Sequence, residues 1–186
     1  MKMMKVRKFE EKDFDRVRFA CLNSDGGRMP ADLCAFILHT FCDYYIENEP
    51  ENCFVVDDNG YAVGYVICTE NYDNYKKIFD EKYLPLTEKY GEKRYNWAKT
   101  STVLQEKYKE DYPAHLHIDL LPEYQRQGWG GKLINALFEH LKSKNVKGVM
   151  LTTGKTNETA CNFYKKYGFD LLGTDGDDAA FGMKLF

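Results

Sequence analysis

The segment His115-Leu-His-Ile-Asp-Leu-Leu-Pro-Glu-Tyr-Gln-Arg-Gln-Gly-Trp-Gly-Gly131 decides the fold of this chain. Its pattern predicts a strand that ends at Pro122, a glycine turn, and a helix in which apolar residues recur at helical spacing up to Leu141. A glycine turn that begins a helix presents unpaired backbone N–H groups and the positive end of the helix dipole to one point. The segment therefore predicts an anion site, best suited to phosphate.

Two common nucleotide-binding motifs do not fit this loop. A dinucleotide fingerprint needs a third glycine where the chain has Leu133. A Walker loop needs a glycine where the chain has Arg126, and a hydroxyl residue where it has Leu133. With both nucleotide motifs excluded, the loop is described by the spacing Gln125-x-x-Gly128-x-Gly130 directly after a strand.

The whole chain has the size and composition of one globular domain. It has 186 residues, of which 44% are hydrophobic and 30% charged, and a net charge of −3. Interspersed charges provide no basic surface, so neither nucleic acid nor a membrane is expected as a partner. The start of the chain has no signal peptide pattern, and no later stretch is long and apolar enough for a membrane span, which predicts a cytoplasmic protein. The six cysteines occur singly, without Cys-x-x-Cys, and are read as reduced core thiols rather than zinc ligands or disulfides; no metal site is predicted.

The remaining pattern alternates between strands and helices. We expect a strand over 3–9, helices over 10–22 and 30–47, a hairpin of 53–56 and 61–68, a strand over 148–153, a helix over 157–167 and a last hairpin of 170–173 and 179–186. This order predicts a single α/β domain over residues 1–186, with a mixed sheet flanked by helices on both faces.

A long insert, residues 71–113, separates the first hairpin from the strand at His115. It holds seven of the fourteen tyrosines and Trp97, and contains helix-like pieces over 72–82 and 102–109. Long aromatic connections often form a lid or a binding wall, whereas the alternative is surface helices packed on the sheet. Its balanced charge argues against a nucleic-acid stacking platform.

A second motif lies downstream, Asn157-x-x-Ala160-x-x-Phe163-Tyr164-x-x-x-Gly168-Phe169. The two motifs, in this order, resemble the GCN5-related N-acetyltransferase (GNAT) superfamily from about Leu116 to Leu172. Within it, the stretch Tyr112–Pro122 looks like the acetyltransferase-like domain that accompanies some O-GlcNAc-removing glycosidases, although this chain has no room for the glycosidase.

The resemblance implies acetyl-CoA as the acetyl donor and assigns residues to bind it. In the superfamily the strand before the loop separates from its neighbour and exposes backbone groups, which here places the Leu120 N–H beside the thioester oxygen. Tyr164 matches the tyrosine that protonates the leaving thiolate, and Asn157 matches a residue that contacts the pantetheine arm. The implied coenzyme-binding set is Ile118, Asp119, Leu120, Gln125, Arg126, Gln127, Gly128, Trp129, Gly130, Gly131, Asn157 and Tyr164. On helical spacing alone, Tyr164 would be read as a core aromatic residue.

The base that accepts the amine proton is sought on the strand before the loop. His115, His117 and Asp119 alternate on one face of it, an unusual set of titratable groups for a central strand. Asp119, nearest the thioester, is the first candidate, and His117 is the second. The alternative is that the histidines bond to neighbouring backbone and that Asp119 pairs with a tyrosine or lysine of the insert.

These residues predict an N-acetyltransferase that transfers acetyl directly to an amine. An acyl-enzyme is not expected, because Cys161 has no histidine partner in the pattern. The alternative is a non-catalytic module that retains the fold and binds coenzyme A or a partner. The acceptor is left open between a small amine, an aminosugar and a peptide, and the oligomeric state between a monomer and a homodimer.

Overall fold

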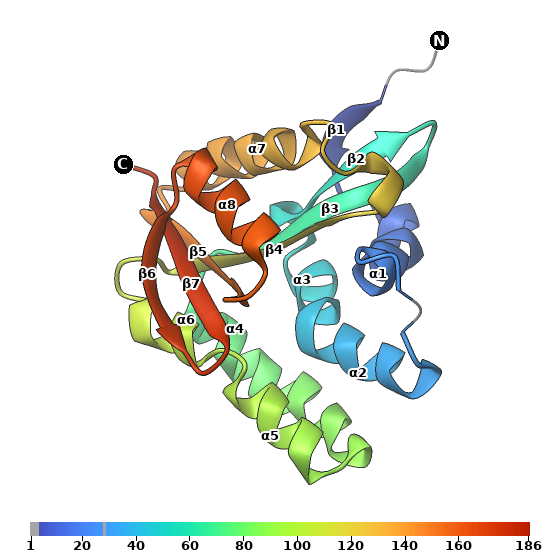
Figure 1. The fold of residues 1–186 in the computed structure, drawn as a ribbon, viewed down its shortest axis with the longest axis vertical. Coiled ribbons are helices and arrows are strands. Elements are labelled where there is room, and N and C mark those ends of the chain that lie inside the picture. The colour runs from blue at the N-terminus through green and yellow to red at the C-terminus, as the bar shows by residue number, and fades with distance from the viewer. Residues whose placement is uncertain (1–3, 28) are drawn as a thin grey trace.

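The computed structural model describes residues 4–27 and 29–186 (Figure 1). One seven-stranded sheet has the order β1-β2-β3-β4-β5-β7-β6, and its neighbours pair antiparallel except for the parallel pair β4–β5. The strands are β1 (Lys5–Lys8), β2 (Phe54–Asp58), β3 (Tyr61–Thr69), β4 (Ala114–Leu120), β5 (Gly148–Gly154), β6 (Asp170–Asp175) and β7 (Asp178–Lys184). The mixed sheet predicted from the sequence is confirmed.

Helices cover both faces of this sheet, as predicted. The α-helices are α1 (Phe14–Asn23), α2 (Ala31–Phe41), α3 (Asp43–Asn48), α4 (Tyr72–Ile78), α5 (Glu92–Thr100), α6 (Val103–Tyr108), α7 (Trp129–Ser143) and α8 (Glu158–Tyr167). In Figure 1, α7 and α8 lie on one side of the sheet, while α1 to α6 lie on the other.

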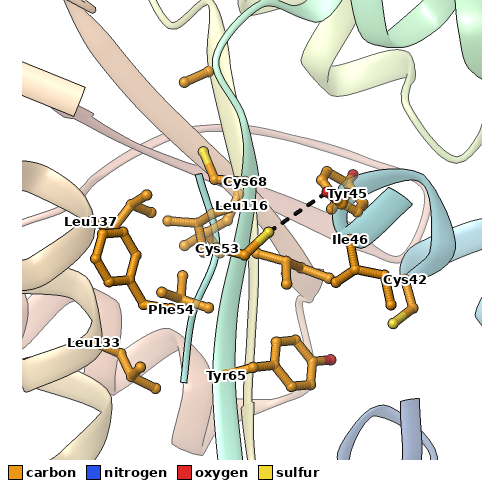
Figure 2. Close-up of a cluster of buried hydrophobic side chains, with 14 of the residues drawn as sticks. Cys42, Tyr45, Ile46, Cys53, Phe54, Tyr65, Cys68, Leu116, Leu133 and Leu137 are labelled. Atoms are coloured by element: carbon orange, nitrogen blue, oxygen red, sulfur yellow. Dashed lines mark hydrogen bonds between the residues drawn. The ribbon is translucent and has the colours of Figure 1, made fainter. Parts of the chain in front are cut away.

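The core lies on both sides of the central strands. Figure 2 shows Leu133 and Leu137 of α7 on one side of the sheet, and Tyr45 and Ile46 of α3 on the other. Each fully buried leucine contributes about 2 kcal/mol through apolar burial. The α7 stripe therefore anchors the element that begins at the glycine turn.

Several boundaries differ from the prediction. The helix expected over 30–47 is broken at Cys42, whose φ of −130° is not helical, into α2 and α3. Directly after the break, the Asp43 carboxylate is buried against His39 Nδ1 (2.8 Å) and Arg18 (3.2 Å). The last hairpin turns at residues 176–177, because β6 continues to Asp175. Of the strand expected over 3–9, residue 3 lies outside the described residues.

The insert, residues 71–113, is helical almost throughout. Between α4 and α5 it contains the short helical segments Phe79–Tyr83 and Leu84–Tyr90. Several of its aromatic side chains pack together in the protein core. Tyr75 stacks on Tyr45 and on Phe79, and Phe79 stacks on Tyr83. Trp97 is the contrast, since 47% of it is exposed. The tyrosines thus follow the alternative of helices packed on the sheet, whereas Trp97 presents an aromatic surface.

Candidate active site

Strands β4 and β5 part after the second residue of β4. They pair only at Ala114–Val149 and His115–Met150, whereas the pairing of β4 with β3 continues to Leu120. The Leu121 N–H donates to the carbonyl of Val63 on β3 (3.0 Å). Backbone groups alternate in direction along a strand, so the Leu120 N–H points away from β3 into the gap. The separation leaves backbone donors of β4 open, as the resemblance implies.

A cavity of about 840 Å³ occupies this gap. It is lined by four segments that the fold brings together: the end of α1, the end of β4, the glycine loop with the first turn of α7, and α8. The lining residues are Ser24, Asp25, Ile118, Asp119, Leu120, Gln125, Arg126, Gly128, Gly130, Gly131, Asn157, Thr159, Ala160, Phe163, Tyr164, Lys166 and Tyr167. Most of the predicted coenzyme-binding residues are thus in one place, while the side chains of Gln127 and Trp129 lie elsewhere.

The glycine loop has an unusual backbone. Arg126 and Gly128 both have positive φ, +58° and +83°, and α7 begins directly after Gly128. Glycine adopts this conformation without a steric cost, whereas for Arg126 it costs about 1 kcal/mol. The Gln125 carboxamide holds the loop by donating to the carbonyl of Leu120 (2.8 Å). The unpaired N–H groups of the α7 N-terminus are therefore presented at the cavity.

The next two glycines bring α8 against α7. A Cβ at Gly130 would lie 3.3 Å from the ring of Phe163, and a Cβ at Gly131 would lie 3.2 Å from the ring of Tyr167. The Tyr167 hydroxyl also donates to the carbonyl of Gly131 (2.9 Å). Both glycines therefore serve a close helix contact that forms one wall of the cavity, in addition to lining it.

The cavity carries charges of both signs. Arg126 and Lys166 line it, and within residues 4–27 and 29–186 neither forms an ion pair. Asp25 and Asp119 bring carboxylates from the end of α1 and from β4. The two free cations suit an anionic ligand, and the two carboxylates suit a cationic one.

Asp119 is the partly buried carboxylate of this site. Its Oδ2 accepts a hydrogen bond from the Tyr65 hydroxyl (2.6 Å), which lies opposite it on β3. Burial raises the pKa of Asp119 to about 6, although the hydroxyls of Tyr65 and Ser24 act in the opposite direction. Its partner is thus a tyrosine, but one from β3 rather than from the insert. A carboxylate with this pKa is mostly ionised at neutral pH and can accept a proton.

Tyr164 faces the same cavity from α8. Its ring packs on Phe169 and Phe181, as a core aromatic residue would, yet it also lines the cavity. In the part of the chain that the structure describes, its hydroxyl has no hydrogen-bond partner. Burial and the charge of Asp119 raise the pKa of the Tyr164 phenol, so it stays protonated and can donate.

The two histidines of β4 have a different environment. The Tyr45 hydroxyl bonds to Nε2 of both His115 (2.8 Å) and His117 (3.1 Å). Burial lowers the pKa of His117 to about 4 and that of His115 well below its usual value, so both rings are neutral at pH 7. Neither residue lines the cavity. The histidines therefore bond to a side chain of α3, not to neighbouring backbone.

Several lining residues were not assigned from the sequence. Thr159 and Lys166 share α8 with the second motif, and helical spacing from Phe163, four residues after Thr159 and three before Lys166, was the signal that could have found them. Ser24 and Asp25 reach the cavity only through the tertiary fold.

Two negative findings apply to residues 4–27 and 29–186. No group of three or more histidine, cysteine, aspartate or glutamate side chains is placed to hold a metal ion. None of the helices found there has the length and apolar character needed to cross a bilayer.

Comparison with known proteins decides the family. The profile described as "Acetyltransferase (GNAT) family" matches residues 22–169. The chain belongs to the GNAT acetyltransferase family. The resemblance found in the two motifs is thereby confirmed, and the cavity is the candidate active site of a GNAT acetyltransferase.

Solved structures agree with this GNAT assignment. The structure titled SsHAT is 28% identical, with a TM-score of 0.88 over 98% of each chain. The PaiA N-acetyltransferase of Thermoplasma acidophilum, in complex with coenzyme A, is 16% identical, with a TM-score of 0.65 over 98% of this chain and 99% of that one. YncA of Salmonella typhimurium, a putative acetyltransferase with its cofactor acetyl-CoA, is 12% identical, with a TM-score of 0.60 over 100% and 95%. The last two likenesses show the fold.

Proposed function

We propose that this GNAT protein uses acetyl-CoA to acetylate an amine by direct transfer. The observation that carries the proposal is the composition of the cavity between β4 and β5. It combines a helix N-terminus and free cations with a carboxylate and a protonated phenol, Asp119 and Tyr164. These are the groups that a phosphate-bearing donor and a proton-releasing acceptor need in one place.

The residues present fit coenzyme A. The backbone N–H groups of the first turn of α7, with Arg126 and Lys166, would hold its phosphates. The open backbone of Ile118 and Leu120 would pair with its pantetheine amides. Asn157 already caps α8, since its Oδ1 accepts from the Ala160 N–H (3.1 Å), which leaves its Nδ2 to donate to the pantetheine arm.

Gln127 and Trp129 contribute backbone only. The Gln127 carboxamide donates to the carbonyl of Glu123 (2.7 Å). The Trp129 ring lies under the Lys132 ammonium, 3.7 Å from the ring centre. Both side chains therefore stabilise the shape of the loop while their N–H groups remain available to the donor.

The chain supplies three groups to the transfer, and the bound donor supplies the thioester. The nitrogen–carbon bond forms as the carbon–sulfur bond breaks. Asp119 accepts the proton that the amine loses, the Leu120 N–H donates to the carbonyl oxygen as it gains negative charge, and the Tyr164 hydroxyl gives a proton to the departing sulfur. General acid or base groups contribute about 10² to 10⁴-fold each, and an oxyanion donor about 10² to 10³-fold.

Direct transfer is supported by the position of Cys161. Its Sγ lies 3.9 Å from the carbonyl of Gly154, and the residue does not line the cavity. A thiol needs a neighbouring base or cation to act as a nucleophile. The amine is therefore the nucleophile in this proposal.

We infer that the acceptor, a small amine, an aminosugar or a peptide, meets an aromatic surface on the other side of β4. Trp97 of the insert lies 5.5 Å from Phe41, and Phe41 lies 5.8 Å from His117, measured between ring centres. His117 is two residues before Asp119 on the same face of β4. Aromatic faces attract cations, which suits a protonated amine. The insert, residues 71–113, would then form a wall of the acceptor site. None of its residues lines the donor cavity.

We infer a cytoplasmic location as well. The six cysteines are all free thiols, three of them buried, as expected of a protein kept in a reducing compartment.

The test is acceptor-dependent release of free coenzyme A from acetyl-CoA. The purified protein is incubated with acetyl-CoA and a panel of small amines, aminosugars and peptides, and thiol is measured with a chromogenic reagent. At least one amine should raise thiol release well above the amine-free rate, with the acetylated amine seen by mass spectrometry. Tight coenzyme binding with no amine-dependent release for any class would instead support a non-catalytic binding module.

A further inference from the structure

The Gln125 carboxamide joins two segments that are far apart in the sequence. Its Nε2 donates to the carbonyl of Leu120 (2.8 Å) and to the carbonyl of Ser24 (2.7 Å), a residue 101 positions away. A carboxamide NH₂ has two hydrogens, so it can serve both oxygens. The first bond attaches the glycine loop to the end of β4, and the second attaches the turn after α1 to the glycine loop.

That turn is a compact local structure. The Gly26 N–H donates to the carbonyl of Asn23 (3.2 Å), and the Gly27 N–H donates to the Asp25 side chain (2.8 Å). Gly26 has a φ of +73°, which other residues adopt only with strain. Its own bonds thus shape the turn, while the Gln125 bond links it to the donor loop.

The turn carries a carboxylate to the reacting end of the cavity. Ser24 and Asp25 line the cavity together with Asp119. The charge of Asp25 contributes to raising the pKa of Asp119, as expected of two carboxylates that face one space. Tyr65 and Tyr164 face Asp119 from β3 and α8, and both stay neutral because burial raises the pKa of each phenol. A protonated amine would be attracted to this pair of carboxylates.

We propose that Gln125 is a positioning residue that couples the donor site to the acceptor site. Coenzyme bound at the glycine loop holds Gln125, Gln125 holds the Ser24–Gly27 turn, and Asp25 of that turn receives the cationic amine. This inference rests on the proposed function.

The test needs coenzyme A but no acceptor. Amide hydrogen exchange of Gly26 and Gly27 is measured by NMR, with and without saturating coenzyme A. In the wild type, coenzyme should slow exchange of these amides about tenfold or more, because a fixed Gln125 restrains local opening. In Gln125→Leu the slowing should fall below about twofold.

Asn23→Leu is the matched control. It removes a carboxamide next to the same turn, where the side chain donates to the carbonyl of Phe19 (2.7 Å), and the full slowing should remain. A merely structural role of Gln125 would change exchange equally with and without coenzyme. If Gln125→Leu fails to bind coenzyme, Gly26→Ala weakens the turn from its other side. It should bind coenzyme as the wild type does and lose the slowing of the Gly27 amide.

Three results would overturn the coupling. The first is that saturating coenzyme A does not slow amide exchange in the wild type. The others are that it slows exchange in Gln125→Leu as much as in the wild type, or that it slows exchange of the Gly27 amide fully in Gly26→Ala. Failure of the wild type to bind coenzyme A would overturn the proposed function itself, so the two failures are distinguishable.

Discussion

The two halves of β4 place titratable side chains on one face of one strand, yet in opposite roles. His115 and His117 lie under α3 and the insert, where one tyrosine hydroxyl bonds to both rings. Asp119 lies where β5 has left β4, so its carboxylate faces a cavity. Burial acts on both halves, lowering the pKa of His117 to about 4 and raising that of Asp119 to about 6. His117, like Asp119, lies beyond the last pair with β5, but α3 covers it; the parting of the strands therefore makes a group available for chemistry only where no helix packs over it.

Replacing the carboxylate should produce the largest effect. Asp119→Asn keeps the size and the hydrogen bond from Tyr65 but removes the base. We expect kcat with the best amine of the panel to fall about 10² to 10⁴-fold. The Kd for coenzyme A, measured by calorimetry, should stay within about threefold. Unchanged kcat would remove Asp119 from the mechanism.

Removing the proton donor on α8 should have the second largest effect. Tyr164→Phe leaves the ring in its packing against Phe169 and Phe181 and deletes the hydroxyl. We expect kcat to fall about 10 to 100-fold, since general acid catalysis at a thiolate leaving group contributes at the lower end of its range. Tyr167→Phe, which deletes a hydroxyl on the same helix, is the control. An equal loss in the two variants would argue that both hydroxyls act on structure alone.

The same Asp119→Asn change should stabilise the fold at high pH. The pKa of Asp119 rises from 3.8 to about 6 on folding, because the charged carboxylate is less stable in the native protein. Below about pH 4 the carboxyl group is protonated and does not destabilise the native state, whereas stability is lost as the pH rises through 6. Allowing for its partial exposure, we expect the variant to gain about 1 to 2 kcal/mol in unfolding free energy at about pH 8. Urea unfolding should show this gain shrinking towards zero at about pH 4. A gain of the same size at both values would contradict the assigned pKa.

The histidines of β4 should respond least in catalysis. His117→Gln retains a hydrogen-bonding group near Tyr45 and removes the ring. We expect kcat to change less than about threefold, because a neutral imidazole tied to Tyr45 takes no part in proton transfer. Unfolding free energy should nevertheless fall by about 1 to 3 kcal/mol through lost packing. A loss in kcat comparable to that of Asp119→Asn would transfer the base role to His117.

The local structure of the proposed donor site could be predicted from the sequence for a physical reason. Its features are local: Gly128 needs a positive φ, and Asn157 caps the helix that follows it directly. Such demands restrict the residue type at the position itself, so spacing alone reveals them.

The contacts around Asp119 and the histidines, on the proposed acceptor side, could not be predicted in the same way, because they join distant segments. Tyr65 lies 54 residues before Asp119, and Tyr45 lies 70 before His115. Neither tyrosine differs in its local pattern from an ordinary core residue. Likewise, the predicted helix breaks at Cys42, next to Asp43, whose buried contact with Arg18 of α1 periodicity does not report.

The most direct measurement of the central claim, that Asp119 at the parted end of β4 is the base, is the pH dependence of kcat with acetyl-CoA and the acceptor both saturating. The base must be ionised, so the wild type should lose activity as pH falls through about 6, about tenfold per unit below it. Tyr65→Phe should move this midpoint upwards, because the tyrosine hydroxyl stabilises the charged carboxylate. In Asp119→Asn the residual activity should show no such limb. A wild-type profile that is flat between about pH 5 and 8, or an unchanged limb in Asp119→Asn, would contradict the account.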